Sequence, residues 1–294
     1  MSLDIDQLRQ WIGRTEDADD IVTAAPLACL QATLDRDDPE PRPGDPLPPS
    51  GHWLYFLATT RQSDLDKNGH AKKGDFLPPV PFERRMWAGG RIRFVGPLHV
   101  GDAIRRRSEI MDVSLKDGKS GPLVFVLVRH RISGPGGLAI EEEHDIVYRG
   151  NAPQDTDKNT DKDAGEALSA QAPGKAVWRR EITPDPVLLF RYSALIFNGH
   201  RIHYDRDYVT KEEGYPGLIV HGPLIATLLM DLVRRENPNA RLARFGYRAR
   251  GPIFDLGPFT VEGEPSPDSA QASLWAMDHK GRVAMTAAAG FETI

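Results

Sequence analysis

One polar segment of the chain holds several side chains that can exchange protons with a substrate. Asn198, His200, His203 and Asp205 lie within eight positions of one another. A neutral imidazole near its normal pKa can take a proton from water at pH 7, and an Asn or Asp neighbour can orient that water. The same residues are also typical of a solvated loop whose histidines only form hydrogen bonds. The residue types indicate acid–base chemistry and leave both interpretations open.

A second feature follows shortly afterwards, where His221-Gly222-Pro223 precedes the apolar run 224–233. Pro223 suits the first turn of a helix, because its missing N–H has no partner there in any case. Gly222 lets another group approach the backbone, and its N–H points with the helix dipole at whatever lies in front. Such an N–H can stabilise a carbonyl oxygen that gains negative charge. An ordinary helix start explains the same residues, so that alternative also stays open.

These two segments resemble the catalytic region of the MaoC-like, (R)-specific enoyl-CoA hydratases, which have the hot-dog fold. The family pattern is a helix ending in Gly-Asp-x-Asn-Pro-x-His-x-Asp, then an apolar pair and His-Gly opening a long helix. Residues 197–205, FNGHRIHYD, match the first part, and residues 219–223, IVHGP, match the second at nearly the family spacing. The resemblance implies that His203 is the catalytic histidine and that Gly222 donates its N–H to the thioester oxygen.

Three positions depart from the family pattern. The family's catalytic Asp corresponds to Asn198, its Asn to His200 and its Pro to Arg201. An amide cannot accept a proton as a base, so His203 must do more of the acid–base work while Asn198 holds the water. We expect His200 and Asp205 to support the loop rather than to react.

The variant FNGHRIHYD, together with FRYSA at 190–194 and PPVPFERRMWAGG at 78–90, resembles one branch in particular. That branch is the two-domain, fatty-acid-synthase-like dehydratase group, which contains mesaconyl-CoA (3-methylfumaryl-CoA) and itaconyl-CoA hydratases. The resemblance implies reversible addition of water to a 2-enoyl-CoA thioester with a short, branched dicarboxylic acyl group. It implies no metal and no redox cofactor, with coenzyme A present only as part of the substrate.

A free carboxylate on the acyl group calls for an arginine, which can bind it through two parallel hydrogen bonds. The candidates are Arg84, Arg85, Arg191 and Arg201. Each of them can equally form a salt bridge in solvent or contact a CoA phosphate. We also assign Trp87, in a loop expected to line the acyl pocket, and His221 to substrate binding.

Two other function classes remain open. A hot-dog acyl-CoA thioesterase shares the carbonyl site at a helix N-terminus, but it needs a carboxylate as base or nucleophile, which Asn198 does not supply. A non-catalytic acyl-CoA binding protein suits the change from Asp to Asn, although the retained His203 argues against it. Product analysis distinguishes the three classes: hydroxyacyl-CoA, free CoA thiol, or neither. A dehydratase for acyl chains on a carrier protein is the nearest variant.

Composition excludes several broad classes. A length of 294 residues suits two modest domains, and a net charge of −5 argues against nucleic-acid binding. No segment is long and apolar enough to span a bilayer. The N-terminal residues lack a basic-then-apolar signal pattern, so we expect a cytoplasmic protein. The single cysteine, Cys29, permits no disulfide within one chain and no Cys-based metal site, and we interpret it as a small buried hydrophobe.

Hydrophobic periodicity predicts the elements that position these residues. We predict helices at 4–13, 24–34, 186–195 and 224–233, and strands at 91–94, 103–113, 123–133, 139–148, 218–220, 261–264, 270–278 and 283–292. The prolines of 77–90 indicate a loop there. Residues 16–23 form an acidic stretch to which no element is assigned.

The second half repeats the order of the first, which indicates two copies of one unit. With the resemblance, this predicts an α+β fold, a tandem (double) hot-dog in which each copy is an antiparallel β-sheet wrapped around a central helix. Residues 1–150 form the first unit with a degenerate site, 151–176 a polar linker, and 177–294 the unit with the catalytic motif. We expect one competent site per chain, an acyl-CoA partner, and pairing of the two units through their sheets within the chain. A homodimer stays open as a separate expectation.

Overall fold

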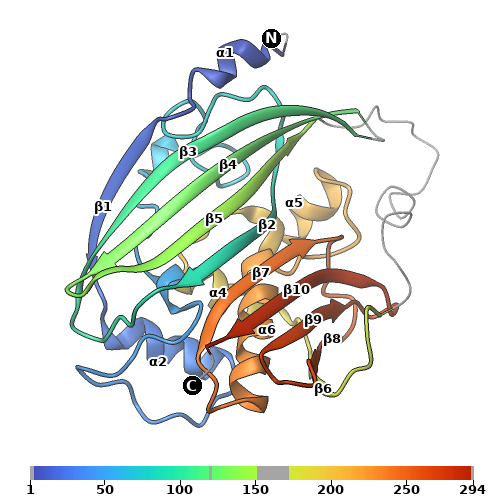
Figure 1. Ribbon diagram of the computed structural model, residues 1–294. Coiled ribbons are helices and arrows are strands. Elements are labelled where there is room, and N and C mark those ends of the chain that lie inside the picture. The colour runs from blue at the N-terminus through green and yellow to red at the C-terminus, as the bar shows by residue number, and fades with distance from the viewer. Residues whose placement is uncertain (1–2, 119–120, 151–171, 293–294) are drawn as a thin grey trace.

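The computed structural model describes residues 3–118, 121–150 and 172–292. Its strands are β1 (Thr15–Ile21), β2 (Arg84–Phe94), β3 (Ala103–Gly118), β4 (Gly121–Gly134), β5 (Gly137–Arg149), β6 (Trp178–Ile182), β7 (Leu242–Ala249), β8 (Phe259–Pro265), β9 (Gln271–Met277) and β10 (Val283–Phe291). These strands form one antiparallel sheet in the order β1-β3-β4-β5-β2-β7-β10-β9-β8-β6 (Figure 1). Five strands come from each half of the chain, and the halves meet where β2 pairs with β7. The sheet therefore pairs the two halves within one chain, as we predicted.

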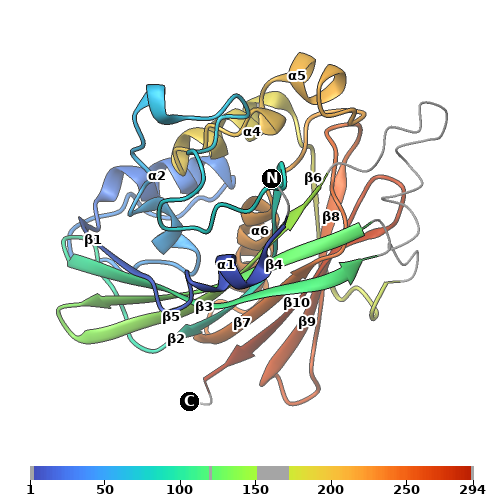
Figure 2. The same ribbon diagram turned by 90° about the horizontal axis from the view of Figure 1, so that it is seen from above.

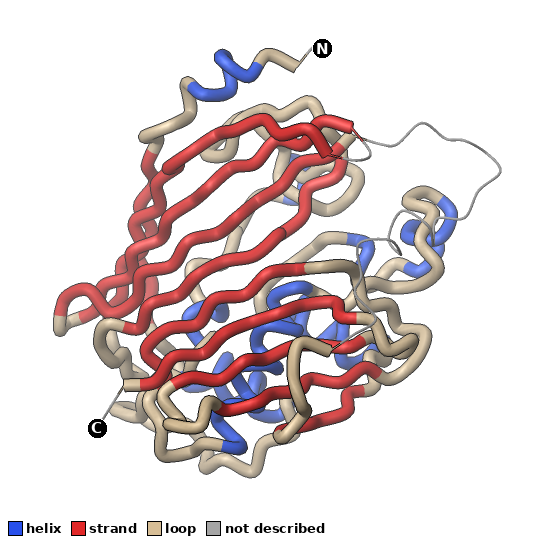
Figure 3. The backbone as a smooth tube through the Cα atoms, turned by 45° about the vertical axis from the view of Figure 1, so that its right-hand side comes forward, coloured by secondary structure: helices blue, strands red, loops and turns tan. Residues whose placement is uncertain are grey.

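The helices lie mainly on one face of this sheet (Figures 2 and 3). The α-helices are α1 (Ile5–Arg9), α2 (Ala24–Thr33), α4 (Pro186–Leu195), α5 (Arg206–Lys211) and α6 (Gly222–Glu236), and the 3₁₀ turns are η1 (Gly51–Leu54), η2 (Gln62–Asp64) and η3 (Arg201–His203). The long central helix is α6, which packs on the strands of the second half. In the first half, α2 packs against α4 and against the turn η1.

Two local signals explain where the second-half helices begin. Asp185 caps α4, because its carboxylate accepts a hydrogen bond from the N–H of Leu188, and Pro186 follows it. Pro223 stands in the first turn of α6, whose residues from Leu224 to Val233 are all buried. A helix segment this apolar and buried around its whole circumference is stable only inside a core, which is where the sheet encloses α6.

Several segments differ from the prediction, among them β6 and β7, where we predicted no strand. The acidic stretch 16–23 forms most of β1, where carboxylates face the arginines of β3; Asp17, for example, lies opposite Arg107. Opposite charges on paired strands stabilise an edge strand that shows no apolar pattern. The loop predicted at 77–90 is irregular only at its start, since β2 begins at Arg84. The predicted strand 218–220 is a single bridge between Ile219 and Phe254. Of the predicted linker, residues 151–171 lie outside the described residues, and the domain boundaries stay a prediction.

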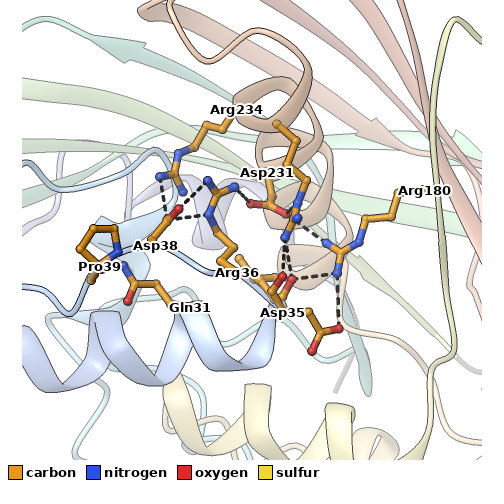
Figure 4. A network of polar contacts seen from close by, with 10 residues as sticks. Gln31, Asp35, Arg36, Asp38, Pro39, Arg180, Asp231 and Arg234 are labelled. Atoms are coloured by element: carbon orange, nitrogen blue, oxygen red, sulfur yellow. Dashed lines mark hydrogen bonds and ion pairs between the residues drawn. The ribbon is translucent and has the colours of Figure 1, made fainter.

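A network of arginines and aspartates joins the loop after α2 to α6 and β6 (Figure 4). Asp231 of α6 lies at its centre, with a side chain that is 2% exposed. It accepts hydrogen bonds from Arg36 at 2.7 Å, Arg180 at 3.0 Å and Arg235 at 2.7 Å. Arg180 and Arg235 also donate to the carbonyl of Leu34, which ends α2. The network therefore fixes the first half against the central helix of the second.

Replacing Asp231 with Asn is expected to lower the free energy of unfolding by about 3–5 kcal/mol, because it leaves buried arginine charges uncompensated. Urea unfolding at neutral pH measures the change. The matched control is Asp207→Asn, since Asp207 pairs with Lys211 on the exposed surface of α5. An exposed pair of this kind contributes about 0–1 kcal/mol. Equal effects of the two variants would contradict the proposed role of the network.

Candidate active site

A cavity of about 1860 Å³ is lined by residues from both halves of the chain. Six of the residues singled out from the sequence are in its wall: Arg85, Trp87, Asn198, His200, His203 and Gly222. Five others are not in the wall: Arg84, Arg191, Arg201, Asp205 and His221. The cavity therefore brings the histidine loop and the start of α6 together and separates the four arginines from one another.

The imidazole of His203 has a defined tautomer. Its Nδ1 lies 2.7 Å from the carbonyl oxygen of Ile219. A carbonyl oxygen only accepts hydrogen bonds, so Nδ1 carries the proton and Nε2 keeps its lone pair. The carbonyl is itself held in place, because Ile219 donates its N–H to Ile202 and bridges to Phe254. His203 is thus arranged to accept a proton at Nε2.

Burial sets the charge state of the histidines in the wall. It lowers the pKa of His203 to about 4, because a charged ring is poorly solvated there; the hydrogen bond to Ile219 opposes this shift. Burial, with repulsion from His203 and Arg85, lowers the pKa of His200 to about 3. Both rings are neutral at pH 7, which is the state from which a general base must start.

Asn198 is held at the turn that follows α4. Its N–H donates to the carbonyl of Ser193 at 2.8 Å, and its Oδ1 accepts the N–H of His200 at 3.0 Å. Because a backbone N–H needs an acceptor, the second bond assigns the orientation of the amide. The Nδ2 hydrogens and the second lone pair of Oδ1 remain for other groups. This arrangement can hold a water molecule but cannot remove its proton.

Gly222 occupies the first position of α6, a helix of 15 residues. The first N–H groups of a helix have no partner within it, and the helix dipole adds positive charge at that end. Apart from its chain neighbours and the backbone of its own helix, no described heavy atom lies within 4 Å of the point where a Cβ on Gly222 would stand. The backbone there is open to the cavity, so a carbonyl oxygen can approach this N-terminus.

His221 lies behind His203 and not in the cavity wall. Its ring is fully buried and stacks on the His203 ring at 3.7 Å, with 19° between the planes. Its Nε2 lies 2.8 Å from the hydroxyl of Ser193. This position does not fit the substrate contact that we assigned to His221 from the sequence. The His221 ring instead packs on the His203 ring and holds it in position.

Two of the predicted arginines are directed away from the cavity. Arg84 donates to the backbone carbonyl of Glu213 at 3.2 Å, and its Nε lies 3.7 Å from the Glu213 carboxylate. Its guanidinium also lies over the ring of Tyr215. Arg191 is exposed on α4. Neither arginine meets the expectation of a contact with the acyl group, because neither lines the cavity.

Arg201 and Asp205 stabilise the loop itself. Arg201 donates to the Asp205 carboxylate at 2.8 and 3.0 Å and stacks over the ring of Tyr208. Asp205 also caps α5, because it accepts the N–H of Tyr208 at 3.0 Å. Asp205 thus has the supporting position expected from the sequence, whereas Arg201 is occupied by this ion pair.

Arg85 is the remaining arginine candidate, and it lines the cavity. Its Nη2 lies 2.8 Å from Nδ1 of His70, a residue of the first half that we did not single out from the sequence. The partner of this guanidinium is therefore an imidazole, in contrast to the carboxylates bound by Arg84 and Arg201. Trp87, two positions further along β2, forms the wall beside it, with its ring 5.2 Å from that of Tyr247.

The first half also contributes a buried polar cluster that sequence reasoning missed. Glu142, 2% exposed, accepts hydrogen bonds from Trp53 at 2.9 Å and contacts His52 at 3.1 Å and His144 at 2.7 Å. Burial alone raises the pKa of Glu142, but the two imidazoles outweigh it and hold the pKa well below the usual range. These residues come from η1 and β5 and share no local motif. The first half therefore lines the cavity with polar groups as well as apolar ones.

The buried histidines predict a loss of stability in mild acid. Burial lowers the pKa of His70, His130, His200, His203 and His221. The unfolded chain binds these protons near pH 6.5, so below that pH it holds more protons than the folded chain. Stability is complete above about pH 6.5 and falls as the pH drops from there toward 4, because the folded chain holds these rings neutral while the unfolded chain protonates them. Urea unfolding at pH 7 and pH 5 measures this, and equal free energies would contradict it.

Three further observations concern metal binding, membrane-crossing helices and the single cysteine. Within residues 3–118, 121–150 and 172–292, no group of three or more His, Cys, Asp and Glu side chains is arranged to hold a metal ion. Among the described helices, none is long and apolar enough to cross a membrane. Cys29 is exposed, because α2 turns Leu27, Leu30 and Thr33 inward instead; our interpretation of Cys29 as buried was wrong.

Comparisons of the sequence and of the structure with known proteins agree on what the chain is similar to. A profile of the family described as hydroxyacyl-thioester dehydratase type 2 matches residues 50–255. The chain is 44% identical over 282 residues to the mesaconyl-C(4)-CoA hydratase of Chloroflexus aurantiacus, covering 94% of this chain and 95% of that one. A MaoC-like dehydratase from Phytophthora capsici superposes with a TM-score of 0.64 at 12% identity, covering 99% of this chain and 100% of that chain. A Mycobacterium tuberculosis protein described as a double hotdog fold superposes with a TM-score of 0.55 at 12% identity, covering 96% of each chain. The predicted double hot-dog fold is therefore confirmed.

Proposed function

The chain belongs to the hydroxyacyl-thioester dehydratase type 2 family, and from this premise we propose that it reversibly adds water to a 2-enoyl-CoA thioester. We propose a short, branched dicarboxylic acyl group, because the relative that is 44% identical is a mesaconyl-C(4)-CoA hydratase. One observation carries the reaction: a histidine with a free Nε2 and a helix N-terminus open at Gly222 belong to the wall of the same cavity.

The reaction follows from these two groups. The N–H of Gly222 donates to the thioester oxygen and polarises the carbonyl, so the β-carbon becomes electrophilic. Nε2 of His203 takes a proton from a water held by Asn198, while the oxygen of that water bonds to the β-carbon. The electron pair of the double bond moves onto the α-carbon and the thioester, where the helix N-terminus stabilises the charge. The proton on His203 then passes to the α-carbon, and the ring returns to its neutral state.

The position of Arg85 supports the dicarboxylic substrate. In 3-methylfumaryl-CoA the free carboxylate is attached to the β-carbon, the atom that water attacks. Its receptor must therefore lie close to the base. Arg85 lines the cavity with its Nη2 2.8 Å from Nδ1 of His70, so the guanidinium lies among the histidines of the cavity wall. Trp87 offers an apolar surface beside it for the methyl group.

Two other function classes, a thioesterase and a non-catalytic acyl-CoA binder, fit parts of this geometry. A thioesterase would use the same helix N-terminus, but the water beside Asn198 would need a carboxylate base. A non-catalytic acyl-CoA binder would need no base at all, yet the Nδ1 bond of His203 leaves Nε2 ready to accept a proton. Hydration therefore explains more of the observed contacts than a thioesterase or a non-catalytic binder does. A carrier-protein-bound acyl chain remains a variant of the same reaction.

The test is an assay of the purified protein with 3-methylfumaryl-CoA, itaconyl-CoA and crotonyl-CoA. Loss of the enoyl thioester absorbance measures hydration, mass spectrometry identifies the hydroxyacyl-CoA, and a thiol reagent detects free CoA. We expect hydration without thiol release, and faster with a dicarboxylic substrate than with crotonyl-CoA. Release of CoA would favour the thioesterase, and binding without turnover would favour the acyl-CoA binder.

The proposed reaction needs no redox cofactor, because addition of water leaves the overall oxidation state unchanged. Its base and its carbonyl donor are His203 and the N–H of Gly222, so no step in it uses a metal. Coenzyme A enters as part of the substrate. The homodimer and the cytoplasmic location remain predictions from the sequence, and the proposed reaction depends on neither.

A further inference from the structure

We propose that His70, supplied by the first half of the chain, acts with Arg85 to bind the free carboxylate of the acyl group. This inference rests on the proposed function, and it adds a specificity residue that lies outside the catalytic segment. The argument has three parts: how His70 is brought to the cavity, which hydrogen atom it presents there, and what charge surrounds it.

A small hairpin brings His70 to the catalytic loop. Residues Leu65 and Ala71 form an isolated bridge, and Gly69 turns the chain with a φ of 88°. The backbone of Gly69 lies so close to Gly199 that an added Cβ would stand 1.8 Å from the Gly199 oxygen. Only glycine fits such a contact. The hairpin is therefore packed directly on the loop that carries His200 and His203.

The two loops meet through the same three residue types. In Asn68-Gly69-His70, the Asn Oδ1 accepts the N–H of the histidine at 3.0 Å. In Asn198-Gly199-His200, the equivalent bond has the same length. The rings of His70 and His200 lie 4.0 Å apart, and Asn68 also accepts the N–H of Arg201 at 3.0 Å. The position of His70 is thus specified by its own turn and by the catalytic loop together.

The contact with Arg85 determines which hydrogen His70 presents. A guanidinium only donates, so Nδ1 of His70 must accept the hydrogen of Arg85 Nη2. Burial, followed by repulsion from Arg85, His200 and His203, holds the pKa of His70 far below its usual range. The ring is therefore neutral and carries its single hydrogen on Nε2. His70 and Arg85 both line the cavity, so together they offer hydrogen-bond donors and no acceptor to an anion.

The charge around this pair favours an anion. Lys73 follows the hairpin directly, and burial and then the charge of Arg85 lower its pKa, while the carboxylates of Asp66 and Glu83 oppose that shift. Lys73 Nζ donates to the carbonyls of Val80 and Phe82. It therefore adds positive charge near Arg85 and leaves the Arg85 guanidinium available to an anion. His200 and His203, which face His70 from the catalytic loop, are neutral. A carboxylate bound to Arg85 and His70 would offset this positive charge, whereas an uncharged acyl group would not.

The test compares kcat/KM for 3-methylfumaryl-CoA with kcat/KM for crotonyl-CoA, which lacks the second carboxylate. In His70→Phe the ring that packs on His200 is kept, while Nδ1 and the Nε2 hydrogen are lost. We expect the ratio of the two values to fall about tenfold to a hundredfold, the usual effect of losing a hydrogen bond to a charged group. His70→Gln, whose amide can supply an N–H near the position of Nε2, is expected to restore part of the ratio.

Two outcomes separate this inference from its premises. An unchanged ratio in His70→Phe would overturn the inference, and if both values fell equally, His70 would only hold the catalytic loop. If the wild type hydrates neither substrate, the proposed function itself fails. Lys67→Ala is the matched control on the same hairpin, because Lys67 is exposed and forms its hydrogen bonds to Asp66 and Arg201 through its backbone, which the substitution keeps.

Discussion

Replacing His203 with Asn is expected to lower kcat/KM for hydration of an enoyl-CoA by about a hundredfold to ten-thousandfold, the usual contribution of a positioned general base. The Asn side chain can still donate to the carbonyl of Ile219, as Nδ1 of His203 does. It has no counterpart of the Nε2 lone pair. The variant therefore removes the base while keeping the contact that orders the loop, and the enoyl thioester absorbance measures the loss.

The pH dependence of the wild type gives an independent check. Because burial lowers the pKa of His203 to about 4, the neutral ring persists through pH 5, and kcat/KM is expected to decline only as the pH falls toward 4. A histidine in water would lose half of its neutral form near pH 6.5. His203→Asn is expected to lack this acid limb. A variant that retains wild-type activity would contradict the assignment of His203 as the base.

Replacing Arg85 with Met is expected to lower kcat/KM for a dicarboxylic enoyl-CoA by about a hundredfold to a thousandfold. Loss of one partner from a buried, hydrogen-bonded charge pair costs roughly 2–5 kcal/mol. Met keeps much of the side-chain volume and removes the charge. Arg85→Lys is expected to restore little, because an ammonium cannot reproduce two parallel hydrogen bonds. Crotonyl-CoA, which has no second carboxylate, is the comparison substrate.

The chain provides a close control in the preceding residue. Arg84 and Arg85 are neighbours on β2, and successive side chains of a strand point to opposite faces. Arg84 is directed toward Glu213 and lies outside the cavity wall. Arg84→Met is therefore expected to leave the preference between the two substrates unchanged. If Arg84→Met and Arg85→Met changed this preference equally, the carboxylate would not be bound by Arg85.

The reactive segment was predictable because its signals are local. A polar loop with Asn198 and His203, followed by a glycine and a proline before an apolar run, encodes a turn and a helix start within a few tens of residues. The structure has the helix where Pro223 predicts it. Helix caps and periodicity act between near neighbours, so the order of residues carries them. The roles of Asn198, His203 and Gly222 in catalysis stay predictions until the variants are measured.

Sequence reasoning misjudged positions whose partners are distant in the chain. The acidic residues of β1 show no apolar alternation, and only the arginines of β3 explain why they form a strand. His221 stands next to Gly222 in the sequence, yet its side chain turns behind His203. In the first half, the histidine that packs on the catalytic loop is in Asn68-Gly69-His70, which we did not single out from the sequence. The repeated tripeptide was the one signal that could have revealed it.

The sequence by itself determined the family resemblance, the antiparallel elements, the catalytic segment and the range of reactions that it can support. Only the tertiary structure decided which arginine reaches the cavity, which histidines support others, and which part of the first half meets the catalytic loop. The reason is physical. The four candidate arginines have the same charged side chain, so the sequence alone cannot tell which of them reaches the cavity. Their environments differ because a strand alternates its faces and because the hairpin around Gly69 packs against Gly199, and such contacts exist only in the folded chain.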